Sequence, residues 1–321
     1  MSAKPRLAYV AFAVVCVVWG STYFAIRVAL EGFPPFFLGA VRFLVAGALL
    51  FAFARWRGER SPRAHEWGSA LLTGVLFFVV GNGLVNMAEQ SVSSGLASVL
   101  VATMPLWVTL FGRLFGARVS RHELAGVVLG LVGVVVLNLG GELRASPGGA
   151  LCALLAPMGW ALGSVASARM PLPGGMMRTA AQMLGGGAAM ALVSGGTHEH
   201  MTAGPSLQAS VALAYLCVFG SLLGFSAYTY LLSNTRPAVA TSYAYVNPII
   251  AVVLGVAVGG ERLGLTSLAG AGVVLTAVIL VGRARRSSQS LASASLSRSM
   301  VAVGSCSTSK RSTTPESSTS T

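Results

Sequence analysis

Two apolar stretches, ASVLVATMPLWVTLFG at Ala97–Gly112 and ATSYAYVNPIIAVVLG at Ala240–Gly255, repeat one pattern at an offset of 143 residues. The alanines that open them, the glycines that close them and the prolines Pro105 and Pro248 all fall in register. Trp19 and Trp160, each near a Gly-Ser pair, match at an offset of 141. The chain therefore reads as a duplicated apolar unit.

Apolar runs of about 20 residues, the length that crosses a bilayer, recur along the whole chain. We expect ten membrane-spanning helices, at residues 7–28, 35–55, 67–88, 94–113, 121–139, 148–168, 176–194, 209–231, 238–258 and 265–282. The repeat divides them into two five-helix halves, residues 7–139 and 148–282. Because five is odd, the second half is inverted relative to the first. The predicted fold class is an all-α membrane protein of two inverted five-helix repeats.

Composition supports a membrane protein. Of the 321 residues, 54% are hydrophobic and 10% are charged, with a mean hydropathy of +0.74, whereas a soluble domain carries about 25% charged residues. The net charge of +13 is spread over short loops between apolar runs. This arrangement favours the lipid bilayer over nucleic acid as the partner.

The loop cations predict the orientation. Fifteen Lys and Arg residues fall at the N-terminus, in alternate loops and after the last span, against two in the opposite loops. Both termini are therefore expected in the cytoplasm of a multi-pass inner-membrane protein. Residues 283–321 are rich in Ser and Thr, and we expect a disordered cytoplasmic tail there.

The sequence argues against an enzyme. It has no Asp, no Gly-x-Ser-x-Gly elbow and no His-Glu-x-x-His motif, and its four cysteines lack metal-ligand spacing. His198-Glu199-His200 is interpreted as a solvated turn because no further ligand accompanies it. We expect no catalytic residue, no metal site and no cofactor.

Pro105 and Pro248 fall in the middle of spans four and nine. Proline removes an intrahelical hydrogen bond, so each is expected to bend its helix. The freed carbonyl groups need a protein or water partner, which places the bends at an interior cavity; a packing kink without a functional role is the alternative.

Polar side chains inside apolar spans mark candidate cavity residues, because they are costly in lipid. Arg42 is expected to attract a substrate carboxylate, and Arg27 either joins it or bonds at its helix end to loop carbonyls or Glu31. Gln182 is the repeat mate of Arg42. For the others, packing or interhelical bonding is the competing role of each taken singly. The proposed substrate cavity comprises Trp19, Thr22, Tyr23, Arg42, Asn82, Asn86, Thr103, Pro105, Trp160, Gln182, Tyr243, Tyr245, Asn247 and Pro248.

Glu89, at the end of the third span, is the carboxylate closest to the membrane interior. It is a possible site of proton coupling, and an exposed residue at the cavity mouth is the alternative. No Glu lies mid-span, so facilitated diffusion or exchange fits the sequence at least as well as proton antiport.

Several segments resemble the drug/metabolite transporter superfamily, specifically its EamA-type ten-helix members and their YedA-like inner-membrane exporters. They are VVWGSTYFAIRVAL (17–30), VRFLVAGALL (41–50), VGNGLVNMAEQ (80–90), SGLASVLVATMPLW (94–107), LPGGMM (172–177) and ATSYAYVNPIIAVVLG (240–255). The resemblance covers residues 7–282 and not the tail. It implies a central substrate cavity between two EamA-type repeats, with both termini cytoplasmic.

The predicted function is a secondary transporter that exports small metabolites or drugs by alternating access. An amino-acid facilitator or exchanger without proton coupling is one alternative, and a lipid- or channel-type membrane module is another. The expected partners are a small-molecule substrate and the bilayer, with the protein as a monomer or a homodimer.

Overall fold

The computed structural model describes residues 3–116, 121–139, 146–201, 204–234, 243 and 246–260, together with residues 262, 264–266, 268–277, 279–280 and 283. These residues form helices and their connections, without strands. The predicted all-α class is confirmed for this part of the chain. Nearly all of the Ser/Thr-rich tail and Tyr245 lie outside the described residues.

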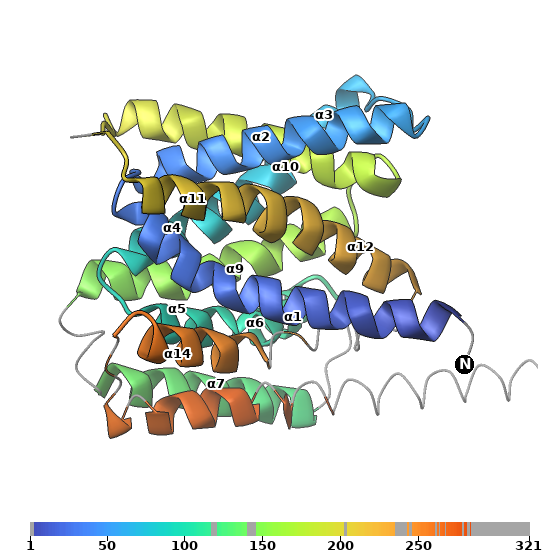
Figure 1. Ribbon diagram of the computed structural model, residues 1–321. Helices are drawn as coiled ribbons and strands as arrows, with labels where there is room; N and C mark the ends of the chain where they lie inside the picture. The colour runs from blue at the N-terminus through green and yellow to red at the C-terminus, as the bar shows by residue number, and fades with distance from the viewer. Residues whose placement is uncertain are drawn as a thin grey trace, which may run out of the picture.

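The helices run side by side in a bundle (Figure 1). In the first half of the chain they are α1 (Ala3–Leu30), α2 (Pro35–Trp56), a third rod made of α3 (Ala64–Gly74), η1 (Val75–Gly83) and α4 (Leu84–Glu89), then α5 (Ser94–Val101), α6 (Met104–Leu114) and α7 (Arg121–Leu139). The π-helical segment η1 inside the third rod was not foreseen from the sequence.

The second half follows a similar order. It contains α9 (Pro147–Ser167), α10 (Gly175–Gly196), a rod made of α11 (Leu207–Tyr215), η2 (Leu216–Leu223) and α12 (Gly224–Asn234), and then α14 (Asn247–Ala257). Residues 268–277 are helical as well. A π-helical segment thus occurs in the third rod of each half.

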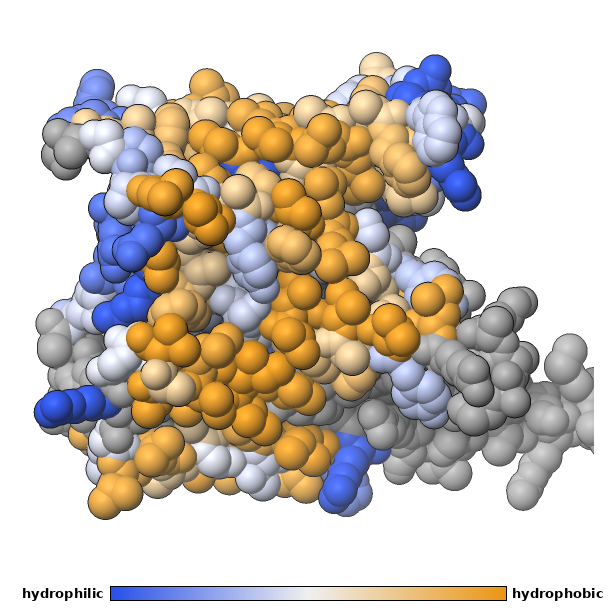
Figure 2. Space-filling view, viewed as in Figure 1, coloured by the Kyte–Doolittle hydropathy of each residue, from blue (hydrophilic) through white to orange (hydrophobic). Residues whose placement is uncertain are grey.

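Six of the described helices are long and apolar enough to cross a membrane: residues 7–30, 35–56, 64–89, 94–114, 147–167 and 207–228. Exposed apolar side chains such as Leu49, Leu151 and Val211 lie on the outer faces of these helices. In Figure 2 the apolar surface forms a broad band, and hydrophilic residues gather towards the two ends of the helices. This is the surface that a bilayer solvates.

The helix starts follow from local sequence. Ser93, Ser146 and Ser206 precede α5, α9 and α11, and each hydroxyl accepts a backbone N–H of the first turn, from Leu96, Gly149 and Ala209. Such caps satisfy amide groups that have no partner within the helix.

The expectation of bent helices at the two prolines needs correction. Pro105 stands in the first turn of α6, after α5 has ended at Val101, and Pro248 stands in the first turn of α14. Proline fits the first turn of a helix because its missing N–H would have no partner there. At Pro105 the span is thus broken into two helices rather than bent.

Helices α2 and α10 form an antiparallel pair whose ends are closed by carboxylates. Glu59, just after α2, accepts the N–H groups of Met176 (3.2 Å) and Met177 (2.8 Å) in the first turn of α10. Glu199, just after α10, accepts those of Phe36 (3.2 Å) and Phe37 (2.9 Å) in the first turn of α2. Each carboxylate therefore caps the helix of the opposite half.

The contacts in the middle of the α2–α10 pair are also related by the repeat. A Cβ added at Gly47 would lie 3.1 Å from Leu184, and one added at Gly187 would lie 3.0 Å from Leu44. These four positions and the two caps correspond at one offset of 140 residues. The absence of side chains at the two glycines lets the helices approach closely, as is common between membrane helices.

Candidate functional site

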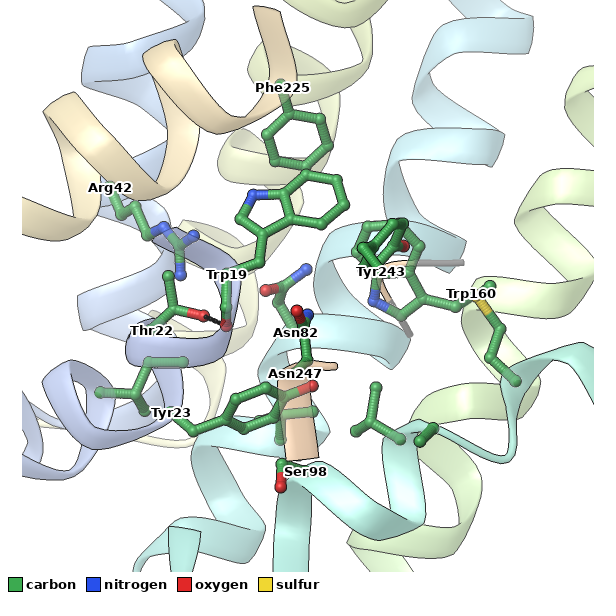
Figure 3. A pocket seen from close by; sticks show the side chains of 15 residues that line it. Trp19, Thr22, Tyr23, Arg42, Asn82, Ser98, Trp160, Phe225, Tyr243 and Asn247 are labelled. Carbon is green, nitrogen blue, oxygen red and sulfur yellow. Dashed lines mark hydrogen bonds between the residues drawn. The ribbon is translucent and has the colours of Figure 1, made fainter. Parts of the chain in front are cut away.

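A cavity of about 90 Å³ lies in the centre of the bundle (Figure 3). It is lined by side chains from α1, α2, η1, α4, α5, α6, α9 and α12, and by residues 243 and 247 from the second half. Its polar and aromatic lining consists of Trp19, Thr22, Tyr23, Arg42, Asn82, Ser98, Trp160, Phe225, Tyr243 and Asn247.

Arg42 carries the positive charge of this cavity. Its side chain is 5% exposed, and its Nε–H donates to the Ser221 hydroxyl at 2.9 Å. The guanidinium carbon also lies 4.8 Å from the centre of the Phe43 ring. Within the described part of the chain no carboxylate pairs with Arg42. The cavity therefore offers a cation whose negative partner is not supplied by these residues.

Aromatic rings form the apolar walls. The Trp19 indole donates its Nε1–H to the Gly220 carbonyl at 3.0 Å, which fixes α1 against η2. The Trp19 ring centre lies 4.9 Å from that of Tyr243 and 5.1 Å from that of Phe225, both in edge-to-face geometry. Packed rings of this kind leave little rotamer freedom, so the walls are pre-formed.

Asn247 joins the first turn of α14 to α1. With its amide oriented to satisfy its neighbours, the nitrogen donates to the carbonyls of Cys16 and Tyr243, both at 3.2 Å. The hydroxyl of Thr22 donates to its own helix, at the Trp19 carbonyl (2.7 Å). Asn82 likewise donates to the Phe77 carbonyl (3.1 Å).

A second, wider cavity of about 500 Å³ adjoins the first. The two share Met104, Trp160, Phe225 and Tyr243, which form a wall between them. The polar groups of the wider cavity come mostly from α9 and α10: Ser164, Ser167, Arg178, Thr179 and Gln182. We call the smaller space the central cavity and the larger one the vestibule.

The structure brings together most of the candidate residues but not all. Trp19, Thr22, Tyr23, Arg42, Asn82, Trp160, Tyr243 and Asn247 line the central cavity, whereas Gln182 lines the vestibule. Neither lining includes Asn86, Thr103, Pro248 or Glu89, and the side chain of Pro105 lies outside the described part of the structure.

The candidate residues that line neither cavity make contacts elsewhere in the bundle. Asn86 donates to the Pro35 carbonyl at 2.9 Å and so joins α4 to the start of α2. Thr103 donates to the Leu100 carbonyl and accepts the indole N–H of Trp107. Pro248 is buried in the first turn of α14.

Glu89 is only 3% exposed, so the alternative of an exposed mouth residue is wrong. Arg27, by contrast, is exposed on the surface of α1 and lines neither cavity.

Sequence reasoning missed several lining groups. Ser98, Phe225 and the serines of α9 carry no signal in a helix that distinguishes them from packing residues. Arg178 is one of the fifteen cations that the sequence assigns to the cytoplasmic side, and nothing in the pattern marks it as a cavity residue. His198-Glu199-His200 is more than a solvated turn, because the Glu199 carboxylate is the cap of α2. Among the described residues, no group of three His, Cys or acidic side chains is placed to hold a metal ion.

Residues 6–139 and 147–283 each match the EamA-like transporter family. The chain belongs to this family. Its EamA-type halves thus both contribute to the central cavity, through α1 and α2 of one and α9 and α12 of the other.

Named relatives agree with this membership. The uncharacterized inner membrane transporter YedA of Escherichia coli K12 is 46% identical over 266 residues, covering 83% of this chain and 87% of its own. The uncharacterized transporter YdfC of Bacillus subtilis is 31% identical over 261 residues, covering 80% and 84%. The EamA-family chain is therefore a multi-pass inner-membrane protein of a transporter family.

More distant similarity is informative as well. A protein of Streptantibioticus cattleyicolor named as a probable terminal-alkyne amino-acid exporter is 26% identical over 274 residues, covering 85% of this chain and 92% of its own. A solved crystal structure at 22% identity matches with a TM-score of 0.60 over 85% of this chain and 96% of the other. At that identity the structural match shows the fold alone.

Proposed function

We propose that this protein is a secondary transporter that exports small amphipathic molecules bearing an anionic group, such as amino acids or related metabolites, across the inner membrane. The observation that carries this proposal is Arg42, a buried cation in an aromatic cavity at the centre of a membrane bundle. The similarity to a probable amino-acid exporter supports the substrate class.

Arg42 favours an anionic substrate for an electrostatic reason. A buried charge in a membrane protein is costly and is kept where it pairs with another charge or faces a substrate path. The described protein offers Arg42 a hydroxyl and an aromatic ring but no carboxylate. A carboxylate of the substrate is the complementary group, since the guanidinium fork binds it with two parallel hydrogen bonds. The rings of Trp19 and Tyr243 would hold the apolar part of the molecule.

The proposed architecture is ten membrane-spanning helices in two inverted repeats, residues 7–139 and 148–282, with both termini in the cytoplasm. The two matches to one family, the two π-helical segments and the reciprocal contacts of α2 and α10 support the repeat. The cations that flank the spans support the orientation.

The proposed mechanism is alternating access. Two similar halves that pack around one site have two closely related arrangements, each open to one side of the membrane. The narrow central cavity and the wide vestibule on one side of it support this mechanism. The cavity residues named from the sequence, including those that line neither space, remain candidates for contacts in the opposite arrangement.

Coupling is a separate question, and Glu89 is our candidate for it. Its burial at the end of α4 favours a protonation site more than the sequence did. If Glu89 couples transport to protons, flux responds to a pH gradient and Glu89→Gln abolishes that response. Flux that changes neither with the pH gradient nor with Glu89→Gln would instead favour facilitated diffusion or exchange.

The test of the function is flux in proteoliposomes with a matched pair of probes, phenylalanine and phenethylamine, which differ by the carboxylate. We expect saturable phenylalanine flux that falls at least about tenfold in Arg42→Gln, the loss that follows from removing a charged hydrogen-bonding partner. Arg27→Gln, which removes an exposed cation outside the cavity, is the matched control. Equal flux of both probes, or normal flux in Arg42→Gln, would refute a carboxylate site at Arg42.

A further inference from the structure

The vestibule contains a polar arrangement that the central cavity does not use. Arg178 and Gln182 lie one helical turn apart on α10, so both side chains stand on the same face of the helix. Arg178 is exposed at the beginning of α10, and Gln182 is buried about 6 Å further along the axis. A molecule that enters the vestibule from this end meets the cation first and the amide second.

The hydrogen bonds leave the binding atoms of both side chains available. The Gln182 amide nitrogen donates to Thr73 Oγ1 (2.9 Å) and Ser167 Oγ (3.1 Å), which fixes the side chain and turns its oxygen away from those partners. The Arg178 Nε–H donates to the Pro173 carbonyl (3.2 Å), and within the described residues no acidic side chain pairs with the guanidinium. The Glu59 carboxylate, at the same end, already accepts two backbone N–H groups of α10.

Gln182 and Arg42 occupy corresponding places in the two halves. They are 140 positions apart, the same offset that relates the two capping carboxylates. Because α2 and α10 are antiparallel and Gly47 meets Leu184, the two residues lie about 10 Å apart along the axis of the pair, at 1.5 Å per residue. The wall of Trp160, Phe225 and Tyr243 stands between their cavities.

We propose that the vestibule is a second substrate site, in which Arg178 attracts the anionic end of the substrate and Gln182 accepts a hydrogen bond from its N–H group before the molecule passes the aromatic wall to Arg42. This inference rests on the proposed function for the identity of the substrate. The electrostatic part of it, an anion-attracting vestibule, stands on the residues of α9 and α10 alone.

The test uses the full-length protein with Cys16, Cys152, Cys217 and Cys306 replaced by alanine, and with Ser164→Cys in the vestibule. Ser164 is a suitable position because, within the described part of the chain, its hydroxyl donates to the Trp160 carbonyl of its own helix (2.8 Å) and to no other helix. The rate of modification is measured in membranes with two methanethiosulfonates, one carrying an anionic sulfonate and one a cationic trimethylammonium group. Their rate ratio reports the local potential without any transport.

We expect Arg178→Gln to lower the ratio of anionic to cationic modification by about tenfold at low ionic strength, because a nearby unit charge acts on the two reagents in opposite directions. Arg169→Gln is the matched control. Arg169 is a cation of the adjacent connection that bonds to Val165 and Phe115 and lines neither cavity. An equal effect of the two variants, or no modification of Ser164→Cys at all, would overturn the proposal.

The second arm adds phenylalanine during modification. We expect phenylalanine to slow modification of Ser164→Cys, both in the otherwise unchanged protein and when Arg42→Gln is added. This protection should be lost when Arg178→Gln is added and reduced when Gln182→Leu is added. No protection in the unchanged protein would overturn the vestibule as a substrate site. Protection that persists while Arg42→Gln transports normally would refute the central site and leave the vestibule standing, so the two proposals fail in different ways.

Discussion

The caps at the two ends of the α2–α10 pair allow a quantitative prediction. Among the described residues, Glu199 is the side chain that satisfies the first turn of α2, and Glu199→Ala removes it. Pro35 has no N–H, and the Leu38 N–H already bonds to the Pro34 carbonyl at 2.8 Å. The N–H groups of Phe36 and Phe37 are the two that remain, and Glu199 accepts both.

The magnitude follows from these two bonds. A side-chain cap contributes about 0.5–2 kcal/mol to helix stability, and a negative charge beside a helix N-terminus about 0.3–1 kcal/mol more. Glu199 is only partly exposed, which limits screening by solvent. We therefore expect Glu199→Ala to lower the free energy of unfolding by about 2 kcal/mol. Glu59→Ala removes the equivalent pair of bonds from α10 and is expected to cost the same.

The measurement is the apparent melting temperature in detergent at a fixed scan rate, followed by circular dichroism at the helix band. A loss of about 2 kcal/mol corresponds to a fall of about 4–8 °C on the scale of larger soluble domains. The two substitutions act at opposite ends of a 22-residue helix, so their effects are expected to add within about 0.5 kcal/mol. Glu31→Ala, which removes an exposed carboxylate at the same end as Glu199, is the matched control.

The reasoning would be refuted by Glu199→Ala melting at the same temperature as Glu31→Ala. A fall confined to Glu199→Ala, with Glu59→Ala unchanged, would refute the equivalence of the two caps while leaving the first one intact.

Two further outcomes concern packing inside the bundle. Gly186→Val should prevent accumulation of folded protein, because a Cβ at this position would lie 2.6 Å from the Gly74 carbonyl oxygen. Gly195→Val is the control and should be tolerated, since the space around Gly195 is open. Expression level and gel-filtration profile compare the two variants. Ser221→Ala should lower stability by about 1–3 kcal/mol, because it leaves the Arg42 Nε–H buried without its acceptor; a melting temperature equal to that of the unchanged protein would contradict this.

The sequence alone identified the features that depend on local pattern. Long apolar runs predict helices regardless of their neighbours, and the family membership follows from motifs such as that around Trp19. Arg42 was foreseen as a cavity residue because an arginine inside an apolar run is conspicuous by itself. Polar and aromatic residues of other helices that line the same cavity, such as Trp19, Asn82 and Trp160, were predicted by the same reasoning.

Other features depend on contacts between distant segments, which pattern does not encode. Glu199 stands in a polar loop, and only the fold places it on the first turn of α2. Asn86 is a polar residue inside an apolar run, as expected of a cavity residue, but its amide donates to the Pro35 carbonyl instead. The repeat makes Gln182 the counterpart of Arg42, but only the antiparallel packing of α2 and α10 places the two residues in different cavities.

The reciprocal caps also have a consequence for biosynthesis. The acceptor for the Phe36 N–H is 163 positions further along the chain. When α2 leaves the ribosome and enters the bilayer, its first turn must therefore rely on water or lipid head groups until the first two helices of the second half, α9 and α10, have been translated. The start of α2 is thus completed only after synthesis of the second half has begun, by the loop that follows α10. In a chain truncated after the first half, the N–H groups of Phe36 and Phe37 would lack their carboxylate acceptor permanently.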